Sequence, residues 1–134
     1  INAFWYGAMY VARQIRRPKL WVVKTADWRI KQNQLKILEW HAQATHPNQI
    51  DTWHDGHFIS QWVDVRTRAA LKDLIGPYEA RSSWQALFVT ADLFHILAVE
   101  TAQSSGYRYP LDLENNVMEI VRSWYEADDL GFYA

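Results

Sequence analysis

The stretch PKLWVVKTADWRIKQNQLKILEWHAQAT, residues 18–45, decides the fold because it predicts one long helix. It contains no Gly, and its single Pro stands at the start, where a helix loses nothing by a missing N–H. At the usual rise per residue such a helix extends roughly 40 Å. We expect the rest of the chain to be organised around it.

One side of this predicted helix carries a ladder of polar residues. Asp27, Gln34 and His41 stand seven residues apart, close to two helical turns, so they fall along one line. The apolar residues of the same face are Val23, Ile30, Ile37 and Leu38. This pattern has two interpretations: a helix that lines a binding cleft, or the boundary between a buried and a solvated face.

Apolar spacing predicts three further main helices, over residues 2–16, 84–105 and 112–125, and a shorter one over residues 65–75. The residues that suit their N-caps are Asn2, Asp64, Ser82 or Ser83, and Asp112. Gly76-Pro77 and Gly106 are typical helix ends. Inward positions of the last helix are Val117, Ile120, Val121 and Trp124, and the chain from Asp128 onward is expected to fray.

Residues 46–56 predict a loop, and residues 58–63 a short apolar segment, either helical or extended. No run shows the alternation of a strand. The sequence therefore predicts an all-α fold: a single domain over residues 1–134, built as a mostly antiparallel bundle of about four main helices plus short ones.

Composition excludes several classes of protein. Apolar residues make up 49% of the chain and aromatic residues 15%, which is too many for disorder. The absence of Cys excludes disulfides and thiolate sites and is compatible with the cytoplasm. A net charge of −1 argues against a nucleic-acid partner. No run is expected to be long and apolar enough to span a membrane.

The charges are nevertheless unevenly distributed. Residues 13–36 carry one acid, Asp27, against Arg13, Arg16, Arg17, Lys19, Lys24, Arg29, Lys31 and Lys36. From residue 112 onward, Arg122 stands against Asp112, Glu114, Glu119, Glu126, Asp128 and Asp129. One part of the molecule is thus expected to face an anion and another a cation, unless these are ordinary solvated faces.

The motifs of a self-sufficient enzyme are missing. The sequence has no Gly-rich phosphate loop, no Ser nucleophile elbow and no paired Asp residues of the kind that hold catalytic Mg²⁺. His54 and His57 flank an Asp-Gly turn without a suitably spaced third ligand, so we predict no metal site.

Several stretches together carry a family resemblance. They are Asn2-Ala3-Phe4-Trp5, Leu38-Glu39-Trp40, Gly56-His57-Phe58-Ile59, Trp84-Gln85-Ala86-Leu87-Phe88, Leu93-Phe94, Val99-Glu100 and Gly106-Tyr107-Arg108-Tyr109-Pro110. This series resembles the C-terminal helical domain of the aminoglycoside 6-adenylyltransferases, also called streptomycin adenylyltransferases. The similarity runs from Asn2 to about Arg122.

The resemblance implies a two-domain enzyme that transfers AMP from ATP to a hydroxyl of an aminoglycoside. It assigns ATP and Mg²⁺ mainly to an N-terminal nucleotidyltransferase domain, which is absent from this sequence, and much of the drug site to the helical domain. This part of the enzyme alone is expected to be inactive and to hold no cofactor.

The resemblance also implies a carboxylate on the long helix that accepts the proton of the drug hydroxyl. In this chain Lys24 occupies that position, and Asp27, one turn further on, is the predicted catalytic base. The predicted substrate-binding residues are Asn2, Trp5, Lys24, Trp28, Glu39 and Trp40. Carboxylates and aromatic faces suit a polycationic drug. Trp5 and Trp40 would equally suit a core, and Glu39 a solvated helix face.

Two alternatives have no need of catalysis by this chain. One is a helical binding module that pairs with a separately encoded nucleotidyltransferase. The other is a structural bundle that dimerises through an exposed apolar face.

Overall fold

The computed structural model describes residues 1–46, 50–52 and 55–128. Its four long helices are α1 (Asn2–Arg16), α2 (Leu20–Thr45), α5 (Ala80–Ser105) and α6 (Leu111–Ala127). Between α2 and α5 lie α3 (Ile59–Trp62), α4 (Val65–Ala70) and the 3₁₀ helix η1 (Leu71–Asp73). The described part of the chain contains no strand, which confirms the all-α prediction.

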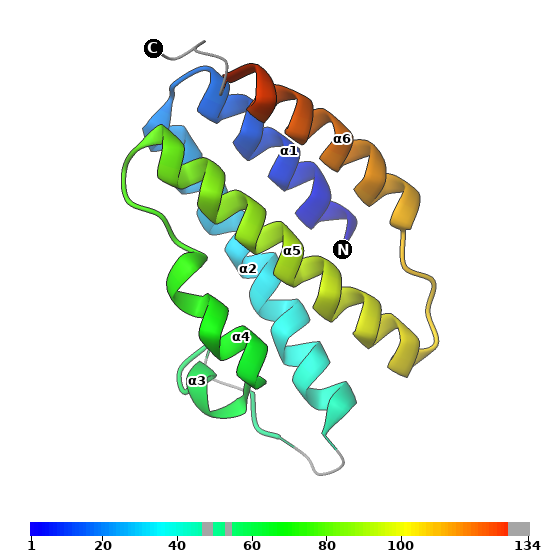
Figure 1. Ribbon diagram of the computed structural model, residues 1–134. Coiled ribbons are helices and arrows are strands. Elements are labelled where there is room, and N and C mark those ends of the chain that lie inside the picture. Colours follow the sequence, from blue (N-terminus) through cyan, green and yellow to red (C-terminus); the bar gives the residue numbers. More distant parts are fainter. Residues whose placement is uncertain (47–49, 53–54, 129–134) are drawn as a thin grey trace.

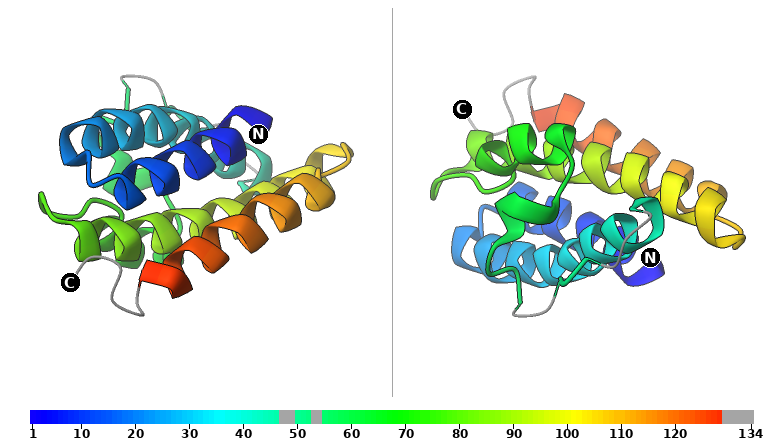
Figure 2. Two further views of the ribbon diagram at one scale, coloured as in Figure 1. Left: turned by 90° about the horizontal axis from the view of Figure 1, so that it is seen from above. Right: turned by 90° about the horizontal axis from the view of Figure 1, so that it is seen from below.

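The long helices form a bundle in which sequence neighbours are antiparallel. Figure 1 shows α1 and α2 running in opposite directions, and likewise α5 and α6. In contrast, α2 and α5 run in the same direction, because the segment with α3 and α4 carries the chain back along the bundle. Figure 2 shows this segment on one side of the α2–α5 pair and α1 and α6 on the other.

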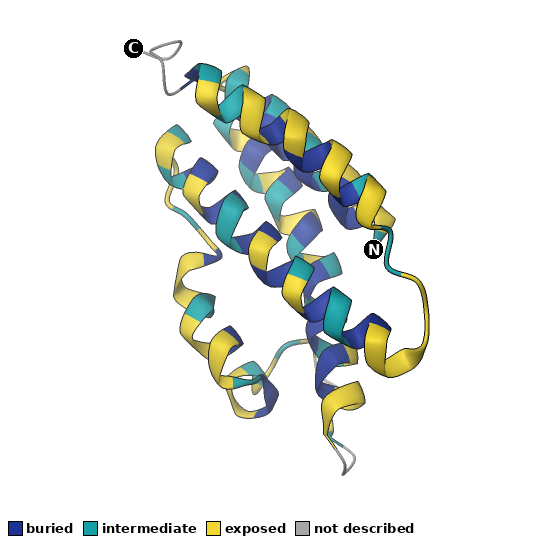
Figure 3. Cartoon of the chain, turned by 45° about the vertical axis from the view of Figure 1, so that its right-hand side comes forward, coloured by how far each residue is buried: buried dark blue, intermediate teal, exposed yellow. Residues whose placement is uncertain are grey.

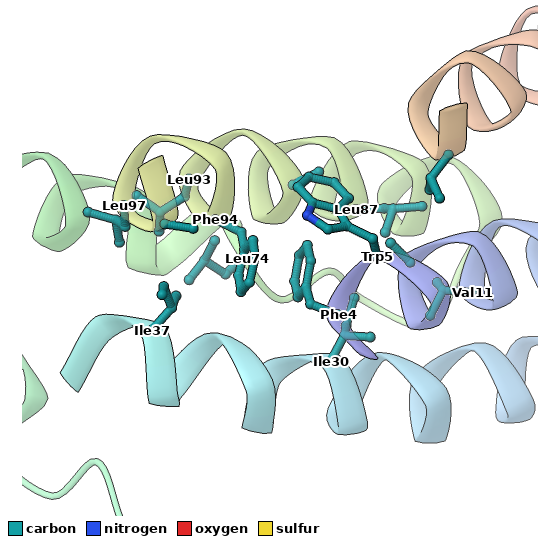
Figure 4. Close-up of a cluster of buried hydrophobic side chains, with 14 of the residues drawn as sticks. Phe4, Trp5, Val11, Ile30, Ile37, Leu74, Leu87, Leu93, Phe94 and Leu97 are labelled. Carbon is teal, nitrogen blue, oxygen red and sulfur yellow. The ribbon is translucent and has the colours of Figure 1, made fainter. Parts of the chain in front are cut away.

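The core lies where α1, α2 and α5 meet. Phe4 and Phe94 stack with ring centroids 3.7 Å apart, and Trp5 meets both rings edge-on. Figure 4 shows these rings between α1 and α5, above Ile30 of α2. A Cβ on Gly7 would lie 2.5 Å from Ile30 Cγ2, so only glycine lets α1 come this close to α2. Figure 3 shows buried residues along the inward side of each long helix.

Two predicted helix ends are confirmed in detail. The Asp64 carboxylate accepts a hydrogen bond from the Thr67 N–H at 2.8 Å, so Asp64 caps α4. Gly106 ends α5 in the left-handed region with φ 75°.

The other predicted caps are wrong by a few residues. The N-cap residue of α1 is Ile1, and no side chain caps this end of the helix. Asn2 is the first residue of the helix itself. Helix α5 begins at Ala80, so Ser82 and Ser83 lie inside its first turn, where the Ser83 hydroxyl donates to the Glu79 carbonyl. Pro110 precedes α6, which places Asp112 in its first turn rather than at its cap.

Other differences concern the length of one helix and the burial of individual side chains. The helix expected over residues 65–75 tightens into η1 after Ala70. Ile120 is 39% exposed rather than inward, whereas Val117 and Val121 are buried as predicted. Asp128 is buried and lies 3.6 Å from Arg16 Nε, so this residue is not frayed. The predicted fraying of 129–134 lies outside the described residues.

The expectation that no run is long and apolar enough to span a membrane is wrong for helix α5. By length and composition alone this helix could cross a membrane, with a mean hydropathy of 1.2 over its most apolar window. More than half of that window is buried within the bundle, as is usual for a core helix. The feature is therefore weak evidence for a membrane.

Candidate substrate site

The polar ladder of α2 turns toward α5 rather than toward solvent. Gln34 and His41 are buried, and their partners are Thr90 and Glu100 on α5. Lys24, Asp27 and Lys31 extend the same side of α2 at spacings of three and four residues. The ladder therefore joins the two parallel helices along most of their length.

Asp27, the predicted base, is held in place by Lys31. Its Oδ1 atom lies 2.7 Å from Lys31 Nζ, and the two side chains are only 15% and 9% exposed. Lys31 Nζ also donates to Thr90 Oγ1 at 2.9 Å. Burial lowers the pKa of Lys31, and the charge and hydrogen bond of Asp27 oppose that shift. Asp27 is thus a positioned carboxylate beside a partly desolvated ammonium group.

Lys24, one turn earlier, reaches the loop that leads into α5. Its Nζ donates to the Gly76 carbonyl at 2.9 Å and to Ser83 Oγ at 3.0 Å. Burial lowers the pKa of Lys24, while Asp27 and Glu79 act in the opposite direction. A carbonyl oxygen accepts hydrogen bonds but cannot donate them, so this place suits an ammonium group better than a carboxylate.

Trp28 lies at a cavity of about 500 Å³ between α2 and the segment that contains α3 and η1. Its lining residues are Trp28, Lys31, Gln32, Gln34, Leu35, Leu38, Asp55, Gly56, Ile59, Leu71, Leu74 and Ile75. A volume of this size is within the range of small-molecule sites, and a mainly apolar lining with a few polar groups is typical of them. The structure thus brings Trp28 and the Asp27–Lys31 pair to one region.

Asn2 and Trp40 come together elsewhere. They line a hollow at the start of α1, together with Tyr107, Arg108 and Pro110 from the α5–α6 connection. Trp40 is 48% exposed there, so its ring is accessible. This hollow and the cavity beside Trp28 are different places on α2.

Trp5 and Glu39 line neither of these hollows. Trp5 is 1% exposed, and its Nε1–H donates to the Tyr109 hydroxyl at 3.0 Å, which in turn donates to Glu114. Its ring thus supports the core and ties α1 to the start of α6. Glu39 is partly buried; burial and the nearby Asp55 raise its pKa, and Lys36 lowers it.

A second polar cluster was not predicted from the sequence. Arg66 of α4 bonds Asp64 and Glu100 at 2.8 Å each, and Glu100 Oε2 lies 3.3 Å from His41 Nε2. Burial would raise the pKa of Asp64, but hydrogen bonds from Thr67 and Arg66 lower it to about 2. Only the Asp64 cap was predicted from the sequence; the contacts that Glu100 makes with Arg66 and His41 join residues 34 and 59 positions apart.

The sequence analysis considered His54 and His57 as metal ligands and predicted no metal site there. Of these two residues, only His57 lies within the described part of the chain. The described residues contain no group of three His, Cys, Asp or Glu side chains placed to hold a metal ion.

Comparison with known proteins identifies the family. The streptomycin adenylyltransferase family model matches residues 1–124. A crystal structure of an aminoglycoside 6-adenyltransferase from Bacillus subtilis superimposes with a TM-score of 0.82 at 18% sequence identity, over 92% of this chain and 47% of that one. This likeness concerns the fold, and the chain spans about half the length of that relative. No curated protein sequence matches the chain. The match to the family model covers nearly the whole chain, and the protein therefore belongs to the streptomycin adenylyltransferase family.

Proposed function

We propose that this chain is the C-terminal, substrate-binding domain of an aminoglycoside 6-adenylyltransferase acting on a streptomycin-type drug. The observation that carries the proposal is the Asp27–Lys31 pair on α2, next to a cavity of about 500 Å³, in a chain of this family. A carboxylate fixed by a neighbouring ammonium group is a suitable proton acceptor for a drug hydroxyl.

The proposal includes a second domain. Since the chain matches only 47% of the solved relative, we assign the phosphates of ATP and Mg²⁺ mainly to an N-terminal nucleotidyltransferase domain. The proposed reaction takes place in the cytoplasm, where ATP is available.

The proposed chemistry conserves atoms and charge. The drug hydroxyl attacks the α-phosphorus of ATP, a P–O bond to that phosphorus forms, and the bond to pyrophosphate breaks. Asp27 accepts the hydroxyl proton. The positive charge of Lys31, 2.7 Å away, holds the carboxylate in the orientation needed for this transfer.

Aromatic and acidic side chains are the proposed contacts for the cationic drug. Trp28 and Trp40 are 61% and 48% exposed, so both rings are free to stack on a cationic group. Glu39 adds a carboxylate between their positions on α2, and Asn2 an amide at the hollow of Trp40. Lys24 keeps the start of α5 against α2.

The test is AMP transfer to streptomycin by the intact two-domain enzyme with Asp27→Asn. Loss of a general base lowers kcat by about 10²-fold or more, while the KM for streptomycin changes less. Asp92→Asn is the control, since it removes an exposed carboxylate from α5. Unchanged turnover of Asp27→Asn would overturn the assignment of the base.

A second candidate function is a non-catalytic module that pairs with another protein or with its own copy. Trp21 favours it, because this ring on α2 is 74% exposed. Sedimentation of the 134-residue chain distinguishes the two: a stable dimer that Trp21→Ser disperses supports the second candidate.

A further inference from the structure

Thr90 of α5 is a buried residue to which the proposed reaction assigns no role. It is 0% exposed, and its hydroxyl accepts a hydrogen bond from Lys31 Nζ at 2.9 Å. The same hydroxyl donates to the Ala86 carbonyl, one turn earlier on α5, at 2.7 Å, and the Leu74 carbonyl at 3.4 Å is a second, more distant acceptor. Because an ammonium group only donates and a hydroxyl has one proton, these roles are fixed.

The same contact recurs earlier along this pair of helices. Lys24 Nζ donates to Ser83 Oγ at 3.0 Å, and the Ser83 hydroxyl donates to the Glu79 carbonyl at 2.6 Å. Both lysine–hydroxyl pairs join residues 59 positions apart. Two turns on each helix lead from one pair to the next, and α2 and α5 are parallel, so the pairs stay in register. The contact of Lys31 with Thr90 is therefore part of how the two helices fit together.

Lys31 depends on such partners because its side chain is largely removed from water. It is 9% exposed, and a buried ammonium group is stable only where acceptors and an opposite charge replace water. Asp27 Oδ1, at 2.7 Å, supplies the charge, and Thr90 supplies a further acceptor. Burial lowers the pKa of Lys31, and Asp27 raises it. A hydroxyl that accepts from the ammonium form also favours that form.

Lys31 connects the predicted base to α5. Asp27 and Lys31 lie one turn apart on α2, and the Lys31 ammonium group bonds the carboxylate and the Thr90 hydroxyl together. Thr90 is itself anchored, because its carbonyl accepts from Gln34 Nε2 at 3.1 Å. The hydroxyl thus stands at a fixed point of α5, where it holds Lys31, and Lys31 in turn holds Asp27.

We propose that Thr90 is a positioning residue for the proposed AMP transfer: its hydroxyl holds the Lys31 ammonium group where that group orients the Asp27 carboxylate. The inference rests on the proposed function, since it concerns the same base. The described residues that line the cavity beside Trp28 do not include Thr90, so Thr90 acts through Lys31 rather than on the drug. Loss of the hydroxyl is therefore expected to lower kcat and to leave the KM for streptomycin nearly unchanged.

The test is AMP transfer to streptomycin by the intact two-domain enzyme with Thr90→Val. Valine has the shape of threonine and keeps the backbone carbonyl that binds Gln34, but it cannot accept from Lys31. We expect kcat to fall about tenfold, because a hydrogen bond to a charged group is lost. Thr90→Ser keeps the hydroxyl and is expected to restore most of kcat. Parental kcat in Thr90→Val, or no recovery in Thr90→Ser, would overturn the proposal.

Thr101→Val is the matched control. Thr101 lies about three turns further along α5, is 2% exposed and donates to the Leu97 carbonyl at 2.6 Å, as Thr90 does to Ala86. In the described part of the chain, no lysine donates to its hydroxyl. The control loses a buried hydroxyl of the same kind without changing the contacts of Lys31, so its kcat should stay at the parental value. Equal losses in both valine variants would show a general effect on α5 and contradict the proposal.

The pH profile of kcat separates positioning from a loss of stability. Among the described residues, the charged groups that act on Lys31 or share its cavity are Asp27, Lys24 and Asp55, whereas α5 contributes the uncharged Thr90. Without its acceptor on α5, Lys31 loses its proton at a lower pH. We expect the alkaline limb of kcat to move to lower pH in Thr90→Val and to stay in place in Thr90→Ser. An unmoved limb in Thr90→Val would count against the proposal.

A measurement on the 134-residue chain needs no turnover. Carbon-13 labelling of the lysine side chains allows the ionisation of Lys31 to be followed by NMR, with its signal assigned from Lys31→Arg. We expect the pKa of Lys31 to be lower in Thr90→Val than in the parent chain, and an unchanged pKa would refute the inference. If Thr90→Val does not fold, Thr90→Ala removes the hydroxyl without placing a methyl group against the ammonium, and carries the same expectations.

The two proposals fail in different ways. Full turnover in Thr90→Val beside a strong loss in Asp27→Asn would refute the role of Thr90 and leave the proposed function standing. Full turnover in Asp27→Asn would overturn the assignment of the base, and with it the inference that Thr90 positions that base.

Discussion

Trp5 takes its role from its partners rather than from its residue type. Its ring is buried against Phe4 and Phe94, and its Nε1–H reaches Tyr109. The family resemblance predicts the same role, substrate binding, for Trp5 and for Trp40, but Trp40 is 48% exposed. Nothing in the local sequence distinguishes the two residues, because burial depends on which helices pack against each one.

The two tryptophans are therefore expected to respond differently to replacement by Phe. Trp5→Phe loses the hydrogen bond to Tyr109 and some packing, and is expected to lower the free energy of unfolding by about 1–3 kcal/mol. Trp40→Phe is expected to change it by less than about 0.5 kcal/mol. Urea unfolding of both variants checks this; equal stability losses would argue against the buried position of Trp5.

Asp64 provides a prediction about pH. Its pKa lies at about 2 in the folded chain, below its ordinary value of 3.8. A carboxylate whose pKa is lowered by folding stabilises the folded chain at any pH above its pKa in the unfolded chain. This stabilisation disappears as the pH falls through the folded pKa of about 2. Asp64→Ala is therefore expected to destabilise the chain by about 1 kcal/mol at neutral pH, since it removes the cap of α4.

The same comparison at acid pH is the check on the mechanism. The difference in urea unfolding between the parent chain and Asp64→Ala should shrink between about pH 4 and pH 2, as the carboxylate takes up a proton. Ser123→Ala is the control, since the hydroxyl that it removes donates to the Ile120 carbonyl rather than to a carboxylate. A difference that stayed constant down to pH 2 would show that the charge of Asp64 contributes nothing.

At the scale of elements, the close approach of α1 and α2 depends on Gly7. Alanine favours a helix by about 1 kcal/mol over glycine, but its Cβ would lie 2.5 Å from Ile30 Cγ2. We expect the clash to exceed the gain, so Gly7→Ala destabilises by about 1–3 kcal/mol. Thermal unfolding shows directly whether Gly7→Ala lowers or raises the stability of the chain.

A double-mutant cycle with Ile30→Ala tests the reason for that effect. Removing the Ile30 side chain also removes the clash, so the second substitution at Gly7 should then be neutral or stabilising. Additive effects of the two substitutions would mean that the helices are not in contact at this point.

The sequence predicted the long helices well and their starts less well. Apolar periodicity located α1, whose buried side is mostly apolar, and the lack of Gly and of an internal Pro located α2. The predicted caps Ser82 and Asp112 were too late, since α5 and α6 begin after Glu79 and Pro110, which carry no capping side-chain bond. Local cap chemistry is a weak signal where tertiary packing already fixes the helix.

At the scale of the whole molecule, the candidate site could be predicted only in part. Asp27 and Trp28 were identified on α2. Thr90, which accepts a hydrogen bond from Lys31, and Leu74, which lines the cavity together with Trp28, lie far away in the sequence. The parallel course of α2 and α5 brings these residues together, and no periodic pattern encodes it. The charge asymmetry is also partly absorbed in the fold, since Lys31 pairs with Asp27 and Arg16 with Asp128.

Titration of streptomycin into the 134-residue chain tests most directly whether this domain carries a drug site. We expect saturable binding that weakens as ionic strength rises from about 0.01 M to about 0.15 M, because a polycation meets carboxylates near the surface. Asp27→Asn should weaken it, and Asp92→Asn should not. Absence of saturable binding at low salt, or binding that neither salt nor Asp27→Asn changes, would contradict the account.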